Sequence, residues 1–490
     1  MKHRSWLGRW QFIILQLLIV SCLWVSFTPS AYASSQLEKL NEIFTLIEQS
    51  HVSGISSEQL FEAAITGILN TLNDPYTSYY NEQEWQTLQQ RFQQTYVGIG
   101  IQFVETKQGL RIKRVYPGSS AHAAGLNPGE IITGVAGQSI AGKATDEVLN
   151  LILGAENTAV ELNILKVNGK ETYKITLIRR SFTIPTVEYK RLDNHIGYIL
   201  ITSFTTDTPQ QVADALATLK VSTPIKGLIV DLRGNPGGYL QSVLDVMKSF
   251  LTAGQVMQSI DRNGLKQAYE ITGGKQVGVP TVVLVDENSA SASEIFAGAM
   301  QDYDLAQIIG TNTFGKGSVQ QLIPLQTGGG LKVTIEHYLT PKGNKVDGIG
   351  ILPDVKVADP LKQVAMGLNH LGTSQFQVEL TEYGTFINQG AFDTLVPVIR
   401  ERQRIYIQAT SLASLMAGNT TWNQKTRQLR LQTSTYTETF GLNNGLLLRD
   451  GKSYLAMDAL TKEFPSLKIR TTTDSIILEW RTDGHHSSVR

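Results

Sequence analysis

Residues 36–94 carry apolar positions at helical spacing, which predicts three helices in this part of the chain. The second helix should end at Asp74-Pro75, because a residue that precedes proline disfavours the helical conformation. The third should be amphipathic over residues 82–93, with Trp85, Leu88 and Phe92 on its inner face. We expect residues 34–95 to form a helical N-terminal region.

From Tyr96 the pattern changes to short strands at 98–103, 110–115 and 131–135, with helices near 121–126 and 145–153. This order resembles a PDZ domain over residues 96–180. The resemblance implies that a peptide adds as a strand beside the sheet, while backbone N–H groups of a loop bind its terminal carboxylate. That loop comprises Gly98, Ile99, Gly100 and Ile101. A second interpretation is that these glycines only make a tight strand entry.

Residues 181–372 alternate short β-branched runs with helical patterns, which favours an α/β core. The strands are expected at 197–201, 227–230, 281–285 and 307–309. The helices are expected at 209–219, 239–250 and 291–303.

Residues 376–490 contain a pattern that appears twice, with Tyr406 of the first copy corresponding to Tyr454 of the second. Each copy reads as a strand, a short helix and a strand, which predicts a small α+β repeat. The unit resembles small modules found at the N-termini of copper amine oxidases and on cell-wall-associated proteins. We interpret it as an attachment or interaction module.

Composition limits the classes of function. A length of 490 residues suggests about three domains. With 43 Lys plus Arg against 43 Asp plus Glu, no strong global field attracts nucleic acid, and we expect no nucleic-acid partner. Cys22 is the only cysteine, which excludes disulfides, a thiolate nucleophile and cysteine metal ligands from the part that follows it. We expect no cofactor and no metal.

The segment 1–33 has the pattern of a signal peptide. Basic residues precede an apolar run at 12–27, and Ala31-Tyr32-Ala33 suits a signal peptidase that cleaves after Ala33. An uncleaved anchor and a lipoprotein lipidated at Cys22 are the alternatives, so association with a membrane surface or cell wall stays open. The protein should be exported, and the pattern does not choose between a periplasm and a thylakoid lumen.

Ser291 lies where the predicted strand 281–285 turns into a helix. Helix N–H groups at such a turn favour developing negative charge, which suits a nucleophile. Ser291 with Glu294 three positions later also fits a capping box, a purely structural alternative.

Lys316 is a candidate base for a serine, since no GxSxG motif with a downstream acid and histidine is present. Only about 0.04% of an exposed lysine is neutral at pH 7. Lowering its pKa by about 3 units requires about 4 kcal/mol of destabilisation of the ammonium, which burial can supply. We therefore predict that Lys316 is enclosed and lacks a carboxylate partner.

Three motifs together resemble the carboxyl-terminal processing peptidases, which are tail-specific Ser/Lys proteases of peptidase family S41. They are Asp231-Leu232-Arg233-Gly234-Asn235-Pro236-Gly237-Gly238, Ser289-Ala290-Ser291-Ala292-Ser293-Glu294 and Gly315-Lys316-Gly317-Ser318-Val319-Gln320. The resemblance covers roughly residues 36–370 and not the C-terminal repeat.

This resemblance implies a multidomain α+β protein with a ClpP/crotonase-like protease core. It further implies Ser291 as nucleophile, Lys316 as base, and Gln320 as the residue that orients the lysine or the serine. The implied oxyanion hole consists of the backbone N–H groups of Gly237 and Ala292. The implied substrates are proteins with accessible C-termini, and the subunit number stays open.

Two other functions fit parts of the sequence. A non-catalytic adaptor would capture protein tails through the PDZ-like module and attach by the C-terminal repeat, without needing Ser291, Lys316 or Gln320. A nucleotide-binding P-loop fits residues 310–316, but Gly317 replaces the Ser or Thr that ligates magnesium.

Overall fold

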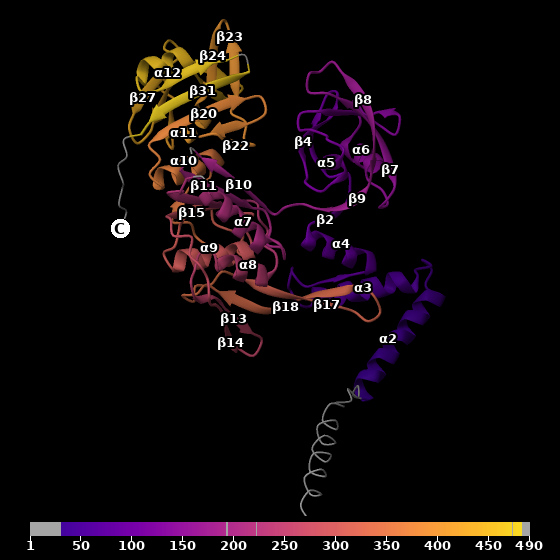
Figure 1. Cartoon of the computed structure of the whole chain (residues 1–490). Coiled ribbons are helices and arrows are strands. Elements are labelled where there is room, and N and C mark those ends of the chain that lie inside the picture. The colour runs from indigo at the N-terminus through magenta and orange to yellow at the C-terminus, as the bar shows by residue number, and fades with distance from the viewer. Residues whose placement is uncertain (1–30, 193–194, 222, 473, 483–490) are drawn as a thin grey trace, which may run out of the picture. The chain divides into compact units, whose positions relative to one another are not determined.

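The computed structural model describes residues 31–192, 195–221, 223–472 and 474–482, and it divides into two compact units (Figure 1). The predicted signal peptide therefore lies almost entirely outside the described residues. In the first unit, which ends at Tyr79, α2 covers Ala31–Ser50 and α3 covers Ser57–Asn70. The division falls within the short strand β1 (Ser78–Tyr80). Among the described helices, none is both long and apolar enough to span a bilayer.

The second unit begins at Tyr80, and α4 (Glu82–Gln93) follows within the predicted bounds. Two short strands, β2 (Thr95–Gly98) and β9 (Arg180–Thr183), pair with each other and lead into and out of a β-rich module. The sheet of this module has the order β3-β4-β5-β7-β8 and is packed by α5 (Ser120–Ala123) and α6 (Thr145–Ile152). Its strands are β3 (Ile101–Thr106), β4 (Gly109–Val115), β5 (Ile131–Val135), β7 (Ala159–Leu165) and β8 (Thr172–Ile178), with β6 (Gln138–Ser139) paired to β5.

The α/β core is built on a six-stranded sheet of order β10-β11-β12-β15-β16-β19, parallel except for β10. The strands are β10 (Val187–Leu192), β11 (Ile196–Ile201), β12 (Gly227–Asp231), β15 (Thr281–Val285), β16 (Gln307–Gly310) and β19 (Val355–Lys356). The central strands β12 and β15 are fully buried, because both faces of the sheet are covered.

The two faces of this sheet pack against different partners. Val230 and Val283 contribute to one hydrophobic core, together with residues of α7 (Thr208–Val221), α8 (Leu240–Met247) and α9 (Ala292–Asp302). Ile229 and Val282 belong to a second core with residues of α10 (Pro360–His370). A separate antiparallel sheet contains β13 (Gly254–Asp261), β14 (Lys266–Ile271), β17 (Ser318–Pro324) and β18 (Gly330–Leu339).

Residues 375–482, here called the C-terminal module, contain two segments with equivalent elements. The strand β24 (Arg404–Gln408) and helix α11 (Ala409–Leu415) of the first segment correspond to β29 (Lys452–Ala456) and α12 (Met457–Glu463) of the second. The two strands pair antiparallel with Ile407 opposite Leu455, so the segments are related by an approximate two-fold axis. The other strands are β20 (Gln375–Thr381), β21 (Thr385–Ile387), β22 (Gly390–Phe392), β23 (Val398–Glu401), β25 (Asn419–Asn423), β26 (Gln428–Gln432), β27 (Thr437–Gly441), β28 (Leu446–Arg449), β30 (Lys468–Thr471) and β31 (Ser475–Arg481).

The C-terminal module shares its hydrophobic core with the α/β core. Phe376 and Leu412 of the module belong to the same buried cluster as Ile229 of β12 and Leu368 of α10. The domain boundary that the sequence suggests near residue 376 is therefore not a boundary in the packing.

Candidate active site

Ser291 directly precedes α9 and has an unusual backbone conformation. Its φ and ψ are 54° and −113°, whereas an ordinary N-cap residue lies in the extended region. A side chain other than glycine at such angles costs about 1–3 kcal/mol and persists only where the surrounding structure enforces it. This strained turn between β15 and α9 distinguishes Ser291 from a serine that only caps a helix.

The carboxylate of Glu294 ties the segments of Ser291 and Lys316 together. One oxygen, Oε2, accepts hydrogen bonds from the backbone N–H of Ser291 (2.8 Å) and of Lys316 (2.9 Å). The other, Oε1, accepts from Thr313 Oγ1 and from the N–H of Gly315, both at 2.6 Å. Glu294 is fully buried, and burial raises its pKa while these four donors oppose that shift. The capping interaction suggested by the sequence therefore extends to the loop that carries the candidate base.

Lys316 lies in the loop between β16 and β17, and it is partly buried rather than fully enclosed. The loop is held tightly on both sides of it. A Cβ at Gly317 would lie 2.2 Å from the backbone nitrogen of Asp347, and the carbonyl of Gly315 accepts a hydrogen bond from Gly348. The backbone of Lys316 is thus fixed by close packing.

Gly237 lies against Ser291 in the loop that follows β12. A Cβ built at Gly237 would lie 2.9 Å from Ser291 Cβ and 3.0 Å from the nitrogen of Ala292, so the two predicted oxyanion donors are neighbours. In this conformation the N–H of Gly237 donates to Asn235 Oδ1 at 2.8 Å. It must exchange or share that bond to reach a substrate carbonyl.

Gln320 lies on β17, and its side-chain amide makes two hydrogen bonds within the adjoining hairpin. Its role in orienting Lys316 or Ser291 stays a prediction. Its Nε2 donates to Ser318 Oγ (2.8 Å) and to Thr334 Oγ1 (3.2 Å). Both partners belong to the β17–β18 hairpin, so the amide orders the strand that leaves Lys316.

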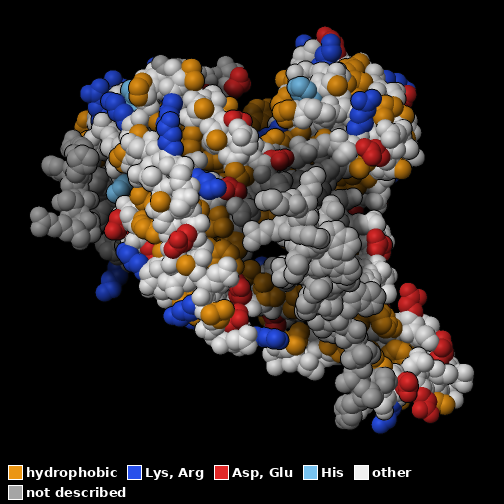
Figure 2. Space-filling model, turned by 60° about the horizontal axis from the view of Figure 1, so that its bottom comes forward, with side chains coloured by type: hydrophobic (Ala, Val, Ile, Leu, Met, Phe, Trp, Pro, Cys, Tyr) orange, Lys and Arg blue, Asp and Glu red, His pale blue; other side chains and the backbone are white. Residues whose placement is uncertain are grey.

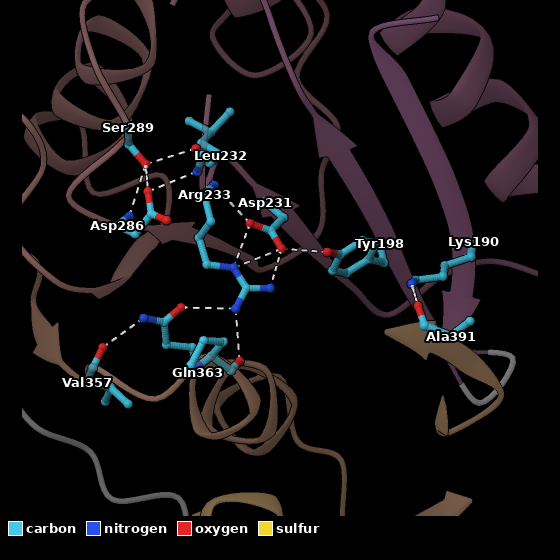
Figure 3. A network of polar contacts seen from close by, with 12 residues as sticks. Lys190, Tyr198, Asp231, Leu232, Arg233, Asp286, Ser289, Val357, Gln363 and Ala391 are labelled. Atoms are coloured by element: carbon cyan, nitrogen blue, oxygen red, sulfur yellow. Dashed lines mark hydrogen bonds and ion pairs between the residues drawn. The ribbon is translucent and has the colours of Figure 1, made fainter. Parts of the chain in front are cut away.

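Several residues that support the site had no role in the sequence analysis. Buried Asn235 donates to the carbonyl of Ile201 (2.8 Å) and accepts from Gly237, while Tyr338 donates to the carbonyl of Ser291 (3.1 Å). A further network joins Asp231 and Arg233 at the start of the loop that follows β12 (Figure 3). The sequence signal for these residues was their place in the family motifs, which include Asp231, Arg233, Asn235 and Glu294.

A second site lies in the β-rich module. A groove of about 660 Å³ contains Gly98, Ile99, Gly100 and Ile101 in its lining, beside the free edge of the sheet at β3. Its other lining residues are largely apolar and comprise Gln90, Tyr96, Val97, Gln102, Phe103, Tyr116, Leu149, Ile152, Leu153, Phe182 and Ile184.

The loop at this groove has a fixed orientation. The carbonyls of Ile99 and Gly100 accept hydrogen bonds from Ala121 and Tyr116. Because C=O and N–H point in opposite directions across a trans peptide, the N–H groups of Gly100 and Ile101 face away from those partners. A Cβ at Gly100 would lie 2.0 Å from Ser119 Cβ, so this position requires glycine.

Two other observations bear on the alternatives. The P-loop interpretation is wrong, because residues 310–316 lead into the strand β17 and not into a phosphate-binding helix. On the face shown in Figure 2, basic and acidic side chains are interspersed among the described residues, without a large field of one sign.

Comparison with known families covers most of the chain. Residues 195–357 match the model of peptidase family S41, residues 86–165 match the PDZ domain, and residues 26–84 match the N-terminal domain of the activating protease CtpB. The predicted resemblances to a PDZ domain and to the S41 family are thereby confirmed. The likeness of the C-terminal module to copper amine oxidase modules stays a prediction.

Individual relatives agree with these models. The carboxy-terminal processing protease CtpB of Bacillus subtilis (strain 168) is 35% identical over 328 residues, which span 66% of this chain and 68% of that protein. The "Probable CtpA-like serine protease" of Staphylococcus aureus (strain COL) is 32% identical over 378 residues, or 74% of this chain and 75% of the relative. Among solved structures, the photosystem II D1 C-terminal processing protease is 26% identical, with a TM-score of 0.41 over 68% of this chain and 96% of that one. The chain therefore belongs to peptidase family S41, among the carboxy-terminal processing proteases, and is a serine-type hydrolase with a PDZ domain.

Proposed function

We propose that this protein is an exported endopeptidase that binds protein C-terminal tails in its PDZ groove and cleaves near the C-terminus with Ser291 as nucleophile and Lys316 as base. The observation that carries the proposal is the shared Glu294 oxygen, which accepts from the backbones of both residues. A glutamate that only capped α9 would not need to accept a hydrogen bond from the backbone of Lys316 as well. The strained backbone of Ser291 supports the same assignment.

In the proposed reaction, the neutral amine of Lys316 takes the hydroxyl proton while Ser291 Oγ bonds to the scissile carbonyl carbon. The oxyanion that forms is stabilised by the N–H groups of Gly237 and Ala292. The ammonium then donates its proton to the leaving amine as the C–N bond breaks. Lys316 then deprotonates a water molecule, whose oxygen attacks the ester carbonyl carbon. The lysine ammonium returns that proton to Ser291 Oγ as the C–O ester bond breaks and the acid product leaves.

Tail recognition is assigned to the groove beside β3. The N–H groups of Gly100 and Ile101 are oriented to receive a terminal carboxylate, and the free edge of β3 can accept the peptide backbone as an added strand. The lining side chains Leu149, Ile152 and Phe103 would contact an apolar last residue. We infer that the substrates are proteins with accessible, apolar C-terminal tails.

Export rests on the basic and apolar pattern of residues 1–33. The compartment is proposed to be a periplasm or a thylakoid lumen, and the C-terminal module is proposed to contribute an interaction surface there.

The test compares wild type with Ser291→Ala and Lys316→Met on an unstructured protein substrate that ends in an apolar residue. We expect both variants to lose at least about 10³-fold in kcat while binding the tail peptide with unchanged affinity, because the groove does not involve these residues. Unchanged turnover in Ser291→Ala would reject the mechanism. If the protein were a non-catalytic adaptor, the wild type itself would bind the tail peptide without cleaving the substrate.

A further inference from the structure

We propose that the C-terminal module is part of the catalytic apparatus: Phe392 and Lys190 hold the ring of Tyr198, and Tyr198 sets the oxyanion loop (residues 234–238) through Asp231 and Arg233. The inference rests on the proposed role of Gly237 in that loop. It makes Lys190, Tyr198 and Phe392 positioning residues, although none of them contacts the reacting atoms.

The first link joins the module to the α/β core. Phe392, at the end of β22, meets the ring of Tyr198 edge to face, with ring centroids 5.4 Å apart and planes at 88°. Between them, Lys190 Nζ lies 3.9 Å from the centroid of Phe392 and 4.6 Å from that of Tyr198. The same ammonium donates to the carbonyl of Ala391 (Figure 3). A cation that contacts two aromatic rings and a carbonyl at once specifies one arrangement of the two strands.

Close packing leaves this junction little freedom to slide. A Cβ at Gly390 would lie 2.1 Å from Cδ2 of Leu192, which is fully buried at the end of β10. Burial also lowers the pKa of Lys190 to about 8, as expected for an amine largely removed from water. The junction is therefore a packed interface, which makes it able to transmit a displacement.

The second link runs from Tyr198 to Arg233. The hydroxyl of Tyr198 donates to Asp231 Oδ2, and burial raises the pKa of Tyr198 well above its usual range, so the donor stays protonated. Asp231 is buried and also accepts from the side chain of Arg233, whose Nη1 donates to Gln363 Oε1 at 3.1 Å. Gln363 lies on α10, so the guanidinium is clamped between strand end and helix (Figure 3).

The third link runs from this pair into the oxyanion loop. Asp231 Oδ1 accepts the backbone N–H of Arg233 at 3.0 Å, which fixes the chain immediately before Gly234. Asn235 and Gly237 follow shortly after, and the N–H of Gly237 donates to Asn235 in the observed conformation. A small displacement of the loop decides whether that N–H reaches a substrate oxygen, and errors of about 1 Å at such donors can cost about 100-fold in rate.

The test uses the full-length protein and three conservative variants: Tyr198→Phe, which removes only the hydroxyl, Lys190→Met, and Phe392→Leu. Tyr189→Phe, at an exposed tyrosine on the same strand as Lys190, and Lys425→Met, at an exposed lysine of the C-terminal module, are the matched controls. Steady-state cleavage gives kcat and KM. The rate of labelling by a fluorophosphonate reports the reactivity of Ser291. The fluorescence anisotropy of a labelled tail peptide reports the affinity of the PDZ groove for that peptide.

We expect each of the three variants to lower kcat and the labelling rate about 5- to 50-fold, with KM and tail affinity within about twofold of wild type and with controls unchanged. The double variant Tyr198→Phe with Phe392→Leu should lose less than the product of the single losses, because both act through one ring. A merely structural role would lower the melting temperature and leave the kcat of the folded fraction intact.

Unchanged kcat in folded Tyr198→Phe and Phe392→Leu, together with inactive Ser291→Ala, would overturn the proposal and leave the proposed function standing. Active Ser291→Ala would instead overturn the proposed function. Fully multiplicative losses in the double variant would overturn the linkage through Tyr198.

Discussion

Replacing Ser291 by glycine should stabilise the α/β core relative to replacing it by alanine. Both substitutions remove the hydroxyl, so the comparison isolates the backbone. At φ 54° and ψ −113°, a residue with a Cβ costs about 1–3 kcal/mol, and glycine avoids most of that cost. Against this gain, glycine loses about 0.5–1 kcal/mol because it is more flexible in the unfolded chain. We expect Ser291→Gly to exceed Ser291→Ala in stability by about 1 kcal/mol.

The assay is hydrogen exchange of peptides that cover α9 at increasing urea, since it reports this region separately from the rest of a multidomain chain. The matched control is Ala290→Gly, at a neighbour whose φ is not in the left-handed region. The control should be destabilised by about 0.5–1 kcal/mol, the ordinary sign for this change. A Ser291→Gly variant that opens more easily than Ser291→Ala would refute the claim that Ser291 is strained.

Three further predictions concern other parts of the chain. Glu294→Gln should lower kcat at least about 100-fold, because the amide N–H₂ would replace a carboxylate oxygen that accepts hydrogen bonds from backbone N–H groups. Wild-type kinetics in this variant would exclude a positioning role for Glu294. Gly100→Ala should weaken tail-peptide binding at least about 10-fold, whereas Gly98→Ala should bind nearly normally, because a Cβ at Gly98 would meet only a ring atom at 3.7 Å. Equal affinities of two variants that circular dichroism shows to be folded would contradict the assigned loop. The pKa of Lys190 is lowered to about 8, so the unfolded chain binds more protons than the native chain between about pH 8 and 10.5. The free energy of unfolding of the wild type should therefore rise with pH across that window, and it should rise less in Lys190→Met. Parallel pH profiles of the two proteins in urea denaturation would disprove this.

Local patterns in the sequence determined much of this protein. Helical periodicity placed α4 at 82–93, because this signal acts within a few turns of the chain. The repeat that relates Tyr406 to Tyr454 reappears in the antiparallel pairing of Ile407 with Leu455. Three short motifs were enough to identify the protease family, since their residue types and spacing are specific in combination.

Only the tertiary structure decided how the site is held. No local pattern states that Ser291 takes a left-handed backbone, that one oxygen of Glu294 accepts from two loops, or that the N–H of Gly237 turns toward Asn235. Nor could periodicity show that the C-terminal module shares a core with β12 and that Phe392 packs on Tyr198. The physical reason is that most of these contacts join residues far apart along the chain, and such contacts depend on the closure of the whole fold rather than on neighbouring residues.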